Sequence, residues 1–310
     1  MQYNQPVPIR ETLAGVYAAV VTPLQADYTL DLDGLTSLLA FLAQRGCDGA
    51  LLMGTTGEGP SLSTQERLEL MRASASIRQE FKRFRLLAGT TTSSLEETIT
   101  LTRAAFELDM DGVVCLPPYF YKKVDDAGLF EWFSQVIRRA VPADGAVMGY
   151  HIPAISGVPF SPDLMARLLE AFPAQFCGLK DSSGDPDHAQ RLGERFGNDL
   201  LLLVGNDRLF SMALRARYSG CITALANLFS PDCHTVWAAH LRSEVNAEAQ
   251  SRLDAARQLM DSHPPAPAFL KSQLAYWHHF PRWAVRPPLR PLSLQEEQRT
   301  VSALAFLGYA

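Results

Sequence analysis

The feature of this sequence that most restricts its fold is a regular alternation of short apolar runs with longer stretches of helical periodicity. The alternation repeats eight times between residues 15 and 244. Such a pattern is typical of parallel strands, because each helix carries the chain back to the edge from which the next strand starts. The predicted strands are residues 15–23, 49–54, 86–90, 112–117, 146–150, 176–181, 201–205 and 220–225. The predicted helices after them are residues 32–46, 63–79, 94–108, 127–140, 161–172, 185–197, 207–218 and 230–244.

Eight uninterrupted repeats, with no dinucleotide-binding fingerprint, favour an α/β (β/α)₈ TIM barrel over a doubly wound sheet. Ser63, with a glutamate three residues on, and Ser161, which precedes a proline, are predicted helix N-caps. Beyond residue 245 the periodicity is helical only, over residues 246–261, 268–280 and 293–307. We therefore predict a barrel over 10–244 and a C-terminal helical extension over 245–310.

Composition narrows the class of function. The 310 residues carry a net charge of −5 with both signs spread along the chain, which argues against nucleic acid and anionic membranes as partners. No apolar run approaches the ~20 residues of a membrane span, and the start, "MQYNQPVPIR", lacks the apolar core of a secretory signal. Five cysteines without a CxxC pair favour buried, reduced thiols. These reduced thiols lead us to expect a cytoplasmic protein. The seven histidines show no zinc-ligand spacing, so we expect no metal.

The residues at the predicted strand ends are the candidates for chemistry, because catalytic groups of such barrels sit at the C-terminal ends of the strands. The second strand runs into "GTTGEG" with Thr55 and Thr56, the fifth ends at Tyr150 and the sixth at Lys180. One lysine, one tyrosine and two threonines are thus directed to one rim. The seventh strand ends at Gly205-Asn206, and the eighth carries Ile222.

Lys180 is the most informative of these residues because it ends the apolar run "FCGL". A charge held away from water is costly unless it is paired or neutralised, and only a neutral amine attacks a carbonyl. Asp181 is expected to face away from the barrel centre, since successive strand residues alternate in direction. The position alone leaves two interpretations open, a lysine that reaches out to solvent and a buried nucleophile. Tyr150 alone fits a core tyrosine, and "GTTGEG" alone fits an ordinary turn.

The motifs "GTTGEG", "PPYFY", "YHIPAISG", "GLKDSSGD" and "GNDRLF", followed by "GCITALAN", occur in one order along residues 10 to 305. In that order they resemble the dihydrodipicolinate synthase / N-acetylneuraminate lyase family of class I, pyruvate-using aldolases. The resemblance implies a (β/α)₈ barrel with a helical extension and a homotetramer built as a dimer of dimers. It also implies chemistry through a covalent Schiff base on Lys180, with no cofactor.

The resemblance assigns roles to the strand-end residues. Lys180 would form the Schiff base with pyruvate or a 2-oxo acid, and Tyr150 would donate and accept protons beside it. Thr55 would pass protons to Tyr150, Thr56 would bind the pyruvate carboxylate, and Ile222 would flank the pyruvate moiety. An iminium withdraws electrons, so bond making or breaking at the adjacent carbon needs such an acid–base group.

Other candidate residues lie at the substrate end or depart from the family pattern. Gly205 and Asn206 are expected to bind substrate. In the synthase an arginine binds the second substrate's carboxylate, and here that position is Ile155. The tyrosine that the synthase supplies to a neighbouring subunit's proton relay corresponds to Phe120 in strict register, and Tyr121 is the candidate to replace it.

The predicted function is a Schiff-base aldolase or lyase that forms or cleaves a bond between pyruvate and an aldehyde, with a 2-keto-3-deoxy acid substrate favoured. Alternatives are 4-hydroxy-tetrahydrodipicolinate synthase, N-acetylneuraminate lyase, a related dehydratase, or a non-catalytic barrel that binds a 2-oxo acid. The combination of Lys180, Tyr150 and Thr55 argues against the last, because a binding protein needs no neutral amine.

Overall fold

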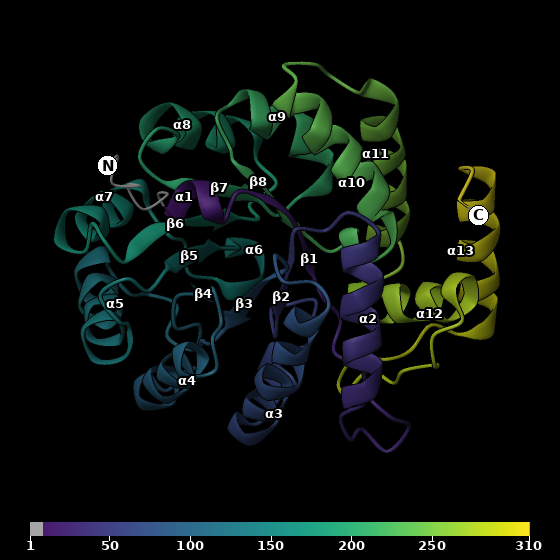
Figure 1. Cartoon of the computed structure of the whole chain (residues 1–310), viewed down its shortest axis with the longest axis horizontal. Coiled ribbons are helices and arrows are strands. Elements are labelled where there is room, and N and C mark those ends of the chain that lie inside the picture. The colour runs from purple at the N-terminus through teal and green to yellow at the C-terminus, as the bar shows by residue number, and fades with distance from the viewer. Residues whose placement is uncertain (1–8, 310) are drawn as a thin grey trace.

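Eight parallel strands close into a barrel in the computed structural model, which describes residues 9–309 (Figure 1). The strands follow one another in chain order, and β8 pairs with β1 to complete the circle. This confirms the predicted TIM-barrel class. The strands are β1 Gly15–Ala19, β2 Gly49–Leu52, β3 Arg85–Gly89, β4 Gly112–Cys115, β5 Val147–His151, β6 Phe176–Asp181, β7 Leu201–Val204 and β8 Gly220–Thr223.

Helices alternate with the strands and form the outer layer of the barrel (Figure 1). The barrel helices are α1 Ile9–Thr12, α2 Leu32–Gln44, α3 Thr64–Ser74, α4 Leu95–Glu107, α5 Asp126–Ala140, α6 Pro153–Ser156, α7 Pro162–Ala171, α8 Pro186–Phe196, α9 Phe210–Arg215 and α10 Ala226–Leu241. Short 3₁₀ turns, η1 Gly59–Ser61, η2 Ala75–Gln79 and η3 Asp207–Leu209, lie between them. Ser63 and Ser161 are N-caps as predicted, and Ser63 forms a capping box with Glu66.

The helices differ from the prediction in detail. The short helices α1 and α6 were not predicted. The helix predicted to start at Ser230 begins at Ala226 instead and breaks at Phe229, whose φ and ψ of −101° and 30° are not helical. The break lets Pro231 lie near the start of the second helical section, where its missing N–H leaves no hydrogen bond unmade.

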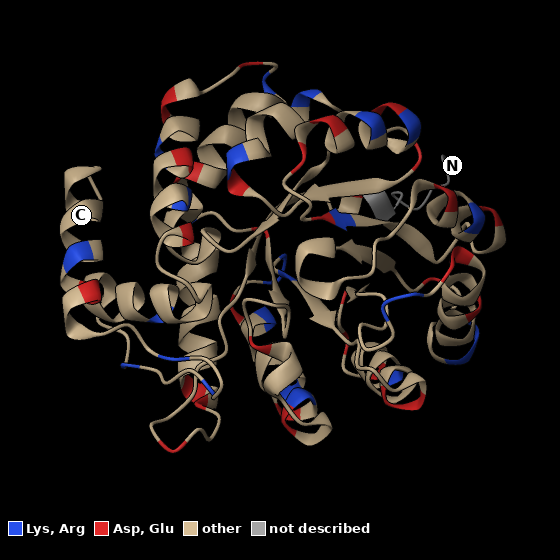
Figure 2. Ribbon diagram, turned by 180° about the vertical axis from the view of Figure 1, so that it is seen from behind, with Lys and Arg blue, Asp and Glu red and all other residues tan. Residues whose placement is uncertain are grey.

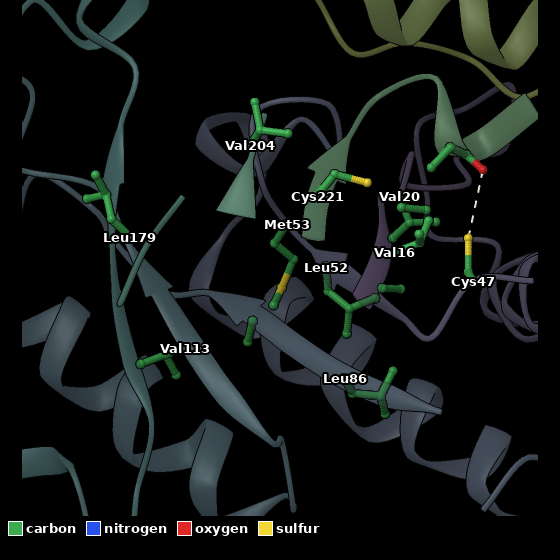
Figure 3. Close-up of a cluster of buried hydrophobic side chains, with 14 of the residues drawn as sticks. Val16, Val20, Cys47, Leu52, Met53, Leu86, Val113, Leu179, Val204 and Cys221 are labelled. Carbon is green, nitrogen blue, oxygen red and sulfur yellow. Dashed lines mark hydrogen bonds between the residues drawn. The ribbon is translucent and has the colours of Figure 1, made fainter. Parts of the chain in front are cut away.

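The core has two layers because successive strand residues point to opposite faces. One set of buried side chains fills the barrel interior and includes Tyr17, Leu51, Leu87, Met148 and Leu203. The other set lies between the strands and the surrounding helices. Figure 3 shows part of this outer layer, with one side chain from each of several strands, among them Val16, Leu52, Leu86, Val113, Leu179 and Val204.

All five cysteines are free, and four of them are buried, with Cys177 half-buried. Burial raises the pKa of Cys115 to about 11 and that of Cys177 to about 12. These thiols are therefore poor nucleophiles at neutral pH.

Helices α11 Ala247–Asp261, α12 Ala266–His278 and α13 Leu294–Phe306 follow the barrel. They lie on one side of it, where α11 and α12 pack on α10 (Figure 1). Figure 2 shows both signs of charge interspersed along the outer helices. Across residues 9–309, no helix combines the length and the apolarity that a bilayer crossing needs. The domain boundary near residue 245 stays a prediction.

A glycine in α8 provides a test of the helix packing. Alanine normally stabilises a helix relative to glycine. A Cβ at Gly193 would instead overlap the backbone carbonyl oxygen of Ala216, just beyond α9. We expect Gly193→Ala to lower the free energy of unfolding by about 1–3 kcal/mol, measured by urea unfolding. The matched control is Gly128→Ala in α5, where the nearest atom would be an Asp125 carboxylate oxygen at 3.4 Å. The control should be neutral or stabilising, and an equal loss in both variants would contradict the packing argument.

Candidate active site

Lys180 and Tyr150 face each other inside the barrel. They are paired in the register between β5 and β6, so both side chains point to the same face of the sheet. The Nζ atom of Lys180 lies 4.2 Å from the centroid of the Tyr150 ring. Lys180 is only 3% exposed. The lysine therefore does not reach out to solvent, which removes one of the two interpretations that the sequence left open.

Thr55 joins this pair from the loop after β2. Its hydroxyl oxygen lies 3.3 Å from the phenol oxygen of Tyr150. The loop has a fixed shape, because Met53 and Glu58 both adopt positive φ angles, 56° and 55°. Such angles are unfavourable for residues other than glycine and persist only where the surrounding structure holds them. Gly59 is required there, since a Cβ would overlap the carbonyl oxygen of Met53.

The electrostatics of Tyr150 are governed by its neighbours. Burial raises the pKa of the phenol, but the nearby Lys180 charge and hydrogen bonds with Thr55, Ser182 and Lys180 outweigh it, so the pKa of Tyr150 is lowered. A proton held between the two groups gives either ammonium beside phenolate or amine beside phenol. The second arrangement contains a nucleophile and an acid, and the first contains a base.

Asp181 does not neutralise Lys180. Its carboxylate lies on the opposite face of β6, where Oδ2 accepts a hydrogen bond from the Tyr218 hydroxyl at 3.1 Å and Oδ1 accepts one from the Ser183 N–H at 3.0 Å. This agrees with the predicted alternation. Among residues 9–309, none of the ion pairs involves Lys180.

The other predicted substrate residues lie at the same ends of their strands. Ile222 is fully buried inside the barrel, and Thr56 is half-buried beside Thr55. The Gly205 N–H donates to the carbonyl of Asp181 at 2.7 Å, which ties the β7 end to the β6 end. Asn206 caps the η3 turn through its side-chain oxygen. The predicted substrate residues at the C-terminal ends of β2, β7 and β8 therefore lie at the same rim of the barrel as Lys180 at the end of β6.

The loop after β4, unlike these residues, exposes its large side chains to solvent. Phe120 and Tyr121 are 71% and 73% exposed, and their rings meet edge to face at 5.2 Å. Ile155 on α6 is also exposed. The ammonium of Lys122 donates to the carbonyl of Ser156 at 2.6 Å and so holds this loop against α6. In the single chain, Tyr121 is presented outward.

Two residues near the site were missed by sequence reasoning. Arg67 and Tyr119 line a cavity that also contains Thr55 and Tyr150. Arg67 is buried and donates to the carbonyl oxygens of Gly59 at 2.5 Å and Thr91 at 3.1 Å. The available signal was its helical spacing from the buried Leu70 and Met71 in α3, which places the guanidinium on the core face.

One cluster of possible metal ligands lies behind the site. His151, Asp181 and His188 place their ligand atoms within 4.8 Å of one another, a proximity that sequence spacing did not show. The donor set does not fit a metal. The Nδ1 atom of His151 accepts the Phe160 N–H at 3.0 Å, so in a neutral ring its Nε2 carries the proton and has no lone pair to offer. Burial lowers the pKa of His151 to about 4, which keeps the ring neutral.

Comparisons with known proteins identify the family of the chain. Residues 12–306 match the model of the dihydrodipicolinate synthetase family. A protein of Chloroflexus aurantiacus named an uncharacterized DapA-like lyase is 38% identical over 91% of this chain and 93% of its own length. A 4-hydroxy-tetrahydrodipicolinate synthase of Coxiella burnetii is 29% identical over 95% of this chain and 98% of its own.

A solved structure shares the fold as well. YagE, a prophage protein of E. coli K12 solved in complex with pyruvate, has a TM-score of 0.89 and 25% identity, and the match covers 96% of this chain and 99% of that one. The chain therefore belongs to the dihydrodipicolinate synthetase family of class I, pyruvate-dependent aldolases, as its motifs predicted. It is an enzyme, a lyase of that family.

The coupling of Lys180 to Tyr150 gives a test that needs no substrate. Because the Lys180 charge lowers the pKa of the Tyr150 phenol, Lys180→Met should raise that pKa. The measurement is a titration of phenolate absorbance, with Tyr150→Phe variants of both proteins subtracted to isolate this ring. Thr55→Val should move the pKa in the same direction to a smaller extent. An unchanged titration in Lys180→Met would mean that the two side chains do not interact in solution.

Proposed function

We propose that the protein is a Schiff-base aldolase that cleaves or forms a carbon–carbon bond between pyruvate and an aldehyde. The observation that carries this proposal is the buried Lys180 amine 4.2 Å from the Tyr150 ring, with no carboxylate paired to it among the described residues. A barrel that merely bound a 2-oxo acid would have no use for such an amine. The proposed chemistry runs through a covalent Schiff base on Lys180 and needs neither a metal nor a cofactor.

In the cleavage direction, the neutral amine of Lys180 attacks the ketone carbon of a 2-oxo acid. The phenol of Tyr150 gives its proton to the departing hydroxyl, so that loss of water leaves an iminium beside a phenolate, and the iminium draws electrons from the adjacent bonds. Tyr150, as phenolate, takes the proton from the C4 hydroxyl while the C3–C4 bond breaks and its electron pair forms an enamine. The aldehyde leaves. Tyr150 then returns the proton to C3, and hydrolysis of the iminium releases pyruvate and restores the amine.

The neighbouring residues support these steps. Thr55, 3.3 Å from the Tyr150 hydroxyl, passes protons to and from the phenol. Thr56 binds the carboxylate of the pyruvate moiety, and the buried Ile222 flanks it. Gly205 and Asn206 bind the remainder of the substrate. Pyruvate is the ligand named in the solved YagE complex, which is consistent with this assignment.

We infer a substrate whose aldehyde half carries no carboxylate near α6, such as a 2-keto-3-deoxy acid. Ile155 offers neither a charge nor a hydrogen-bond donor at the position where the synthase has an arginine. The second candidate is 4-hydroxy-tetrahydrodipicolinate synthase, which is the name of the Coxiella burnetii relative. N-acetylneuraminate lyase and a related dehydratase remain alternatives within the same Schiff-base chemistry.

We also infer a homotetramer, a dimer of dimers, in the cytoplasm. Phe120 and Tyr121 are large aromatic side chains that are more than two-thirds exposed on a loop held in place by Lys122. Exposed aromatic side chains of this kind are typical of subunit interfaces. In such a tetramer Tyr121 would enter the proton relay of a neighbouring subunit.

The Schiff base can be trapped directly. Incubation with pyruvate and borohydride should attach a reduced pyruvyl group to Lys180, detected by mass spectrometry, because borohydride reduces the iminium to a stable amine. Lys180→Ala should abolish both trapping and cleavage. Tyr150→Phe should lower turnover by about two to four orders of magnitude while trapping survives better. Labelling at another lysine, or activity lost to a chelator, would refute the mechanism.

The substrate class is tested by competition between reactions. Without a guanidinium at position 155 the protein lacks a charged hydrogen bond that contributes about 1.5–3 kcal/mol, or about one to two orders of magnitude in specificity. We expect pyruvate release from 2-keto-3-deoxy acids to have the higher kcat/KM, and condensation of pyruvate with aspartate semialdehyde to be poor. A reductase-coupled assay showing the opposite order would favour the synthase.

A further inference from the structure

The two loops that carry proposed substrate residues each end in a buried acid. Glu58 closes the loop after β2, directly after Thr55, Thr56 and Gly57, and Asp207 follows Gly205 and Asn206 after β7. Both carboxylates are almost inaccessible, with side-chain exposures of 0%. Neither acid has a place in the chemistry of the Schiff base. A buried carboxylate is costly without a partner of opposite charge, so we identify the partner of each acid.

The partner of Glu58 comes from the C-terminal helices. Lys271, on α12, donates to the Oε1 atom of Glu58 at 2.5 Å and to the carbonyl of Ala284 at 2.6 Å. The other carboxylate oxygen accepts the backbone N–H of Arg286 at 2.8 Å. Both oxygens of Glu58 are therefore bound by the extension. The backbone N–H of Glu58 in turn donates to the carbonyl of Thr55 at 3.1 Å, so the acid and the threonine are one rigid unit.

The partner of Asp207 also comes from the C-terminal helices. Arg257, on α11, donates to the Oδ2 atom of Asp207 at 3.0 Å and to Asp261 at 2.8 Å. Gln250, two turns earlier on the same helix, donates to the backbone carbonyl of Asp207 at 3.0 Å. The β7 loop is thus held by its side chain and its backbone at the same point.

The two contacts follow one rule: the acid belongs to a loop of the barrel and the cation belongs to the extension. An isolated buried ion pair adds little to stability compared with apolar side chains of the same size, but it fixes geometry, because a displaced partner leaves a bare charge. Glu58 is also held at a positive φ angle that only a well-anchored residue keeps. The ion pairs are placed where geometry matters most, one residue or two from the proposed substrate groups.

We propose that Lys271 and Arg257 are positioning residues, through which the C-terminal extension sets the two substrate loops of the barrel. This inference rests on the proposed Schiff-base function. Lys271 acts on Thr55 and Thr56 and therefore on the pyruvate end of the site. Arg257 acts on Gly205 and Asn206 and therefore on the part of the substrate beyond pyruvate. The two variants are expected to fail in different ways, which a general loss of stability would not produce.

The first experiment removes the Glu58 contact. Lys271→Met leaves the buried Glu58 carboxylate without a partner, which destabilises the fold. The double variant Glu58→Gln/Lys271→Met removes both charges at nearly constant volume and is expected to stay folded. In both, a displaced Thr55–Thr56 loop should slow borohydride trapping of pyruvate and lower kcat by about 100-fold, the usual cost of a 1 Å misplacement. Trapping at the wild-type rate in the folded double variant would overturn the assignment of Lys271.

The second experiment removes the Asp207 contact. In Asp207→Asn/Arg257→Met, pyruvate trapping should stay within about twofold of wild type, while kcat/KM for the full 2-oxo acid falls at least about tenfold through KM. An equal loss of trapping and cleavage, in step with the thermal midpoint, would show that Arg257 is only structural and overturn its assignment.

The matched control is Asp232→Asn/Arg252→Met. This pair joins α11 to α10 at 2.6 Å and touches neither loop. It should shift the thermal midpoint and leave trapping and KM unchanged. If the control lowers trapping as much as the Glu58 double variant, the positioning inference fails. A wild-type protein that neither traps pyruvate nor cleaves 2-oxo acids would refute the proposed function itself, so the two failures are distinguishable.

Discussion

The structure depends on the register between β5 and β6, which puts Tyr150 beside Lys180 on the inner face of the barrel. A shift of β6 by one residue would turn Lys180 away from the interior and bring Asp181 inward, while Tyr150 kept its place. Close approach of the backbones constrains β6 on its other side, against β7. A Cβ at Gly178 would overlap the carbonyl of Leu201 in β7, so β6 can lie this near its neighbour only with glycine there. The place of Lys180 therefore depends on backbone packing of β6 as well as on its pairing with β5.

Much of the fold could be predicted from local pattern alone. Every predicted strand exists, because alternating apolar runs and helices leave few other ways to bury both layers. Lys180 was identifiable because an ammonium after a buried run is costly, and Asp181 was placed outward by strand periodicity alone. The helix start at Ala226 was not predicted; the helix breaks at Phe229, whose ring lies 4.6 Å from that of Tyr309, far along the chain.

What the sequence could not provide is proximity between distant residues. Arg67 lies beneath the loop after β2 because α3 turns one face inward, and its two carbonyl acceptors come from separate loops. His151 and His188 stack at 4.7 Å although 37 positions apart, and no local motif marks them. The same is true of Glu58 and Asp207, which would pass as ordinary loop acids in the sequence. Their burial becomes visible only once the C-terminal helices are in place.

The contact between Glu58 and Lys271 joins residues 213 positions apart. During synthesis from the N-terminus, the second strand and its loop leave the ribosome long before α12 is made. Until then the Glu58 carboxylate lacks its Lys271 partner, and the loop lacks the contact that holds it in the finished structure. A nascent barrel of this chain is consequently incomplete at the loop after β2 until the C-terminal helices have been made.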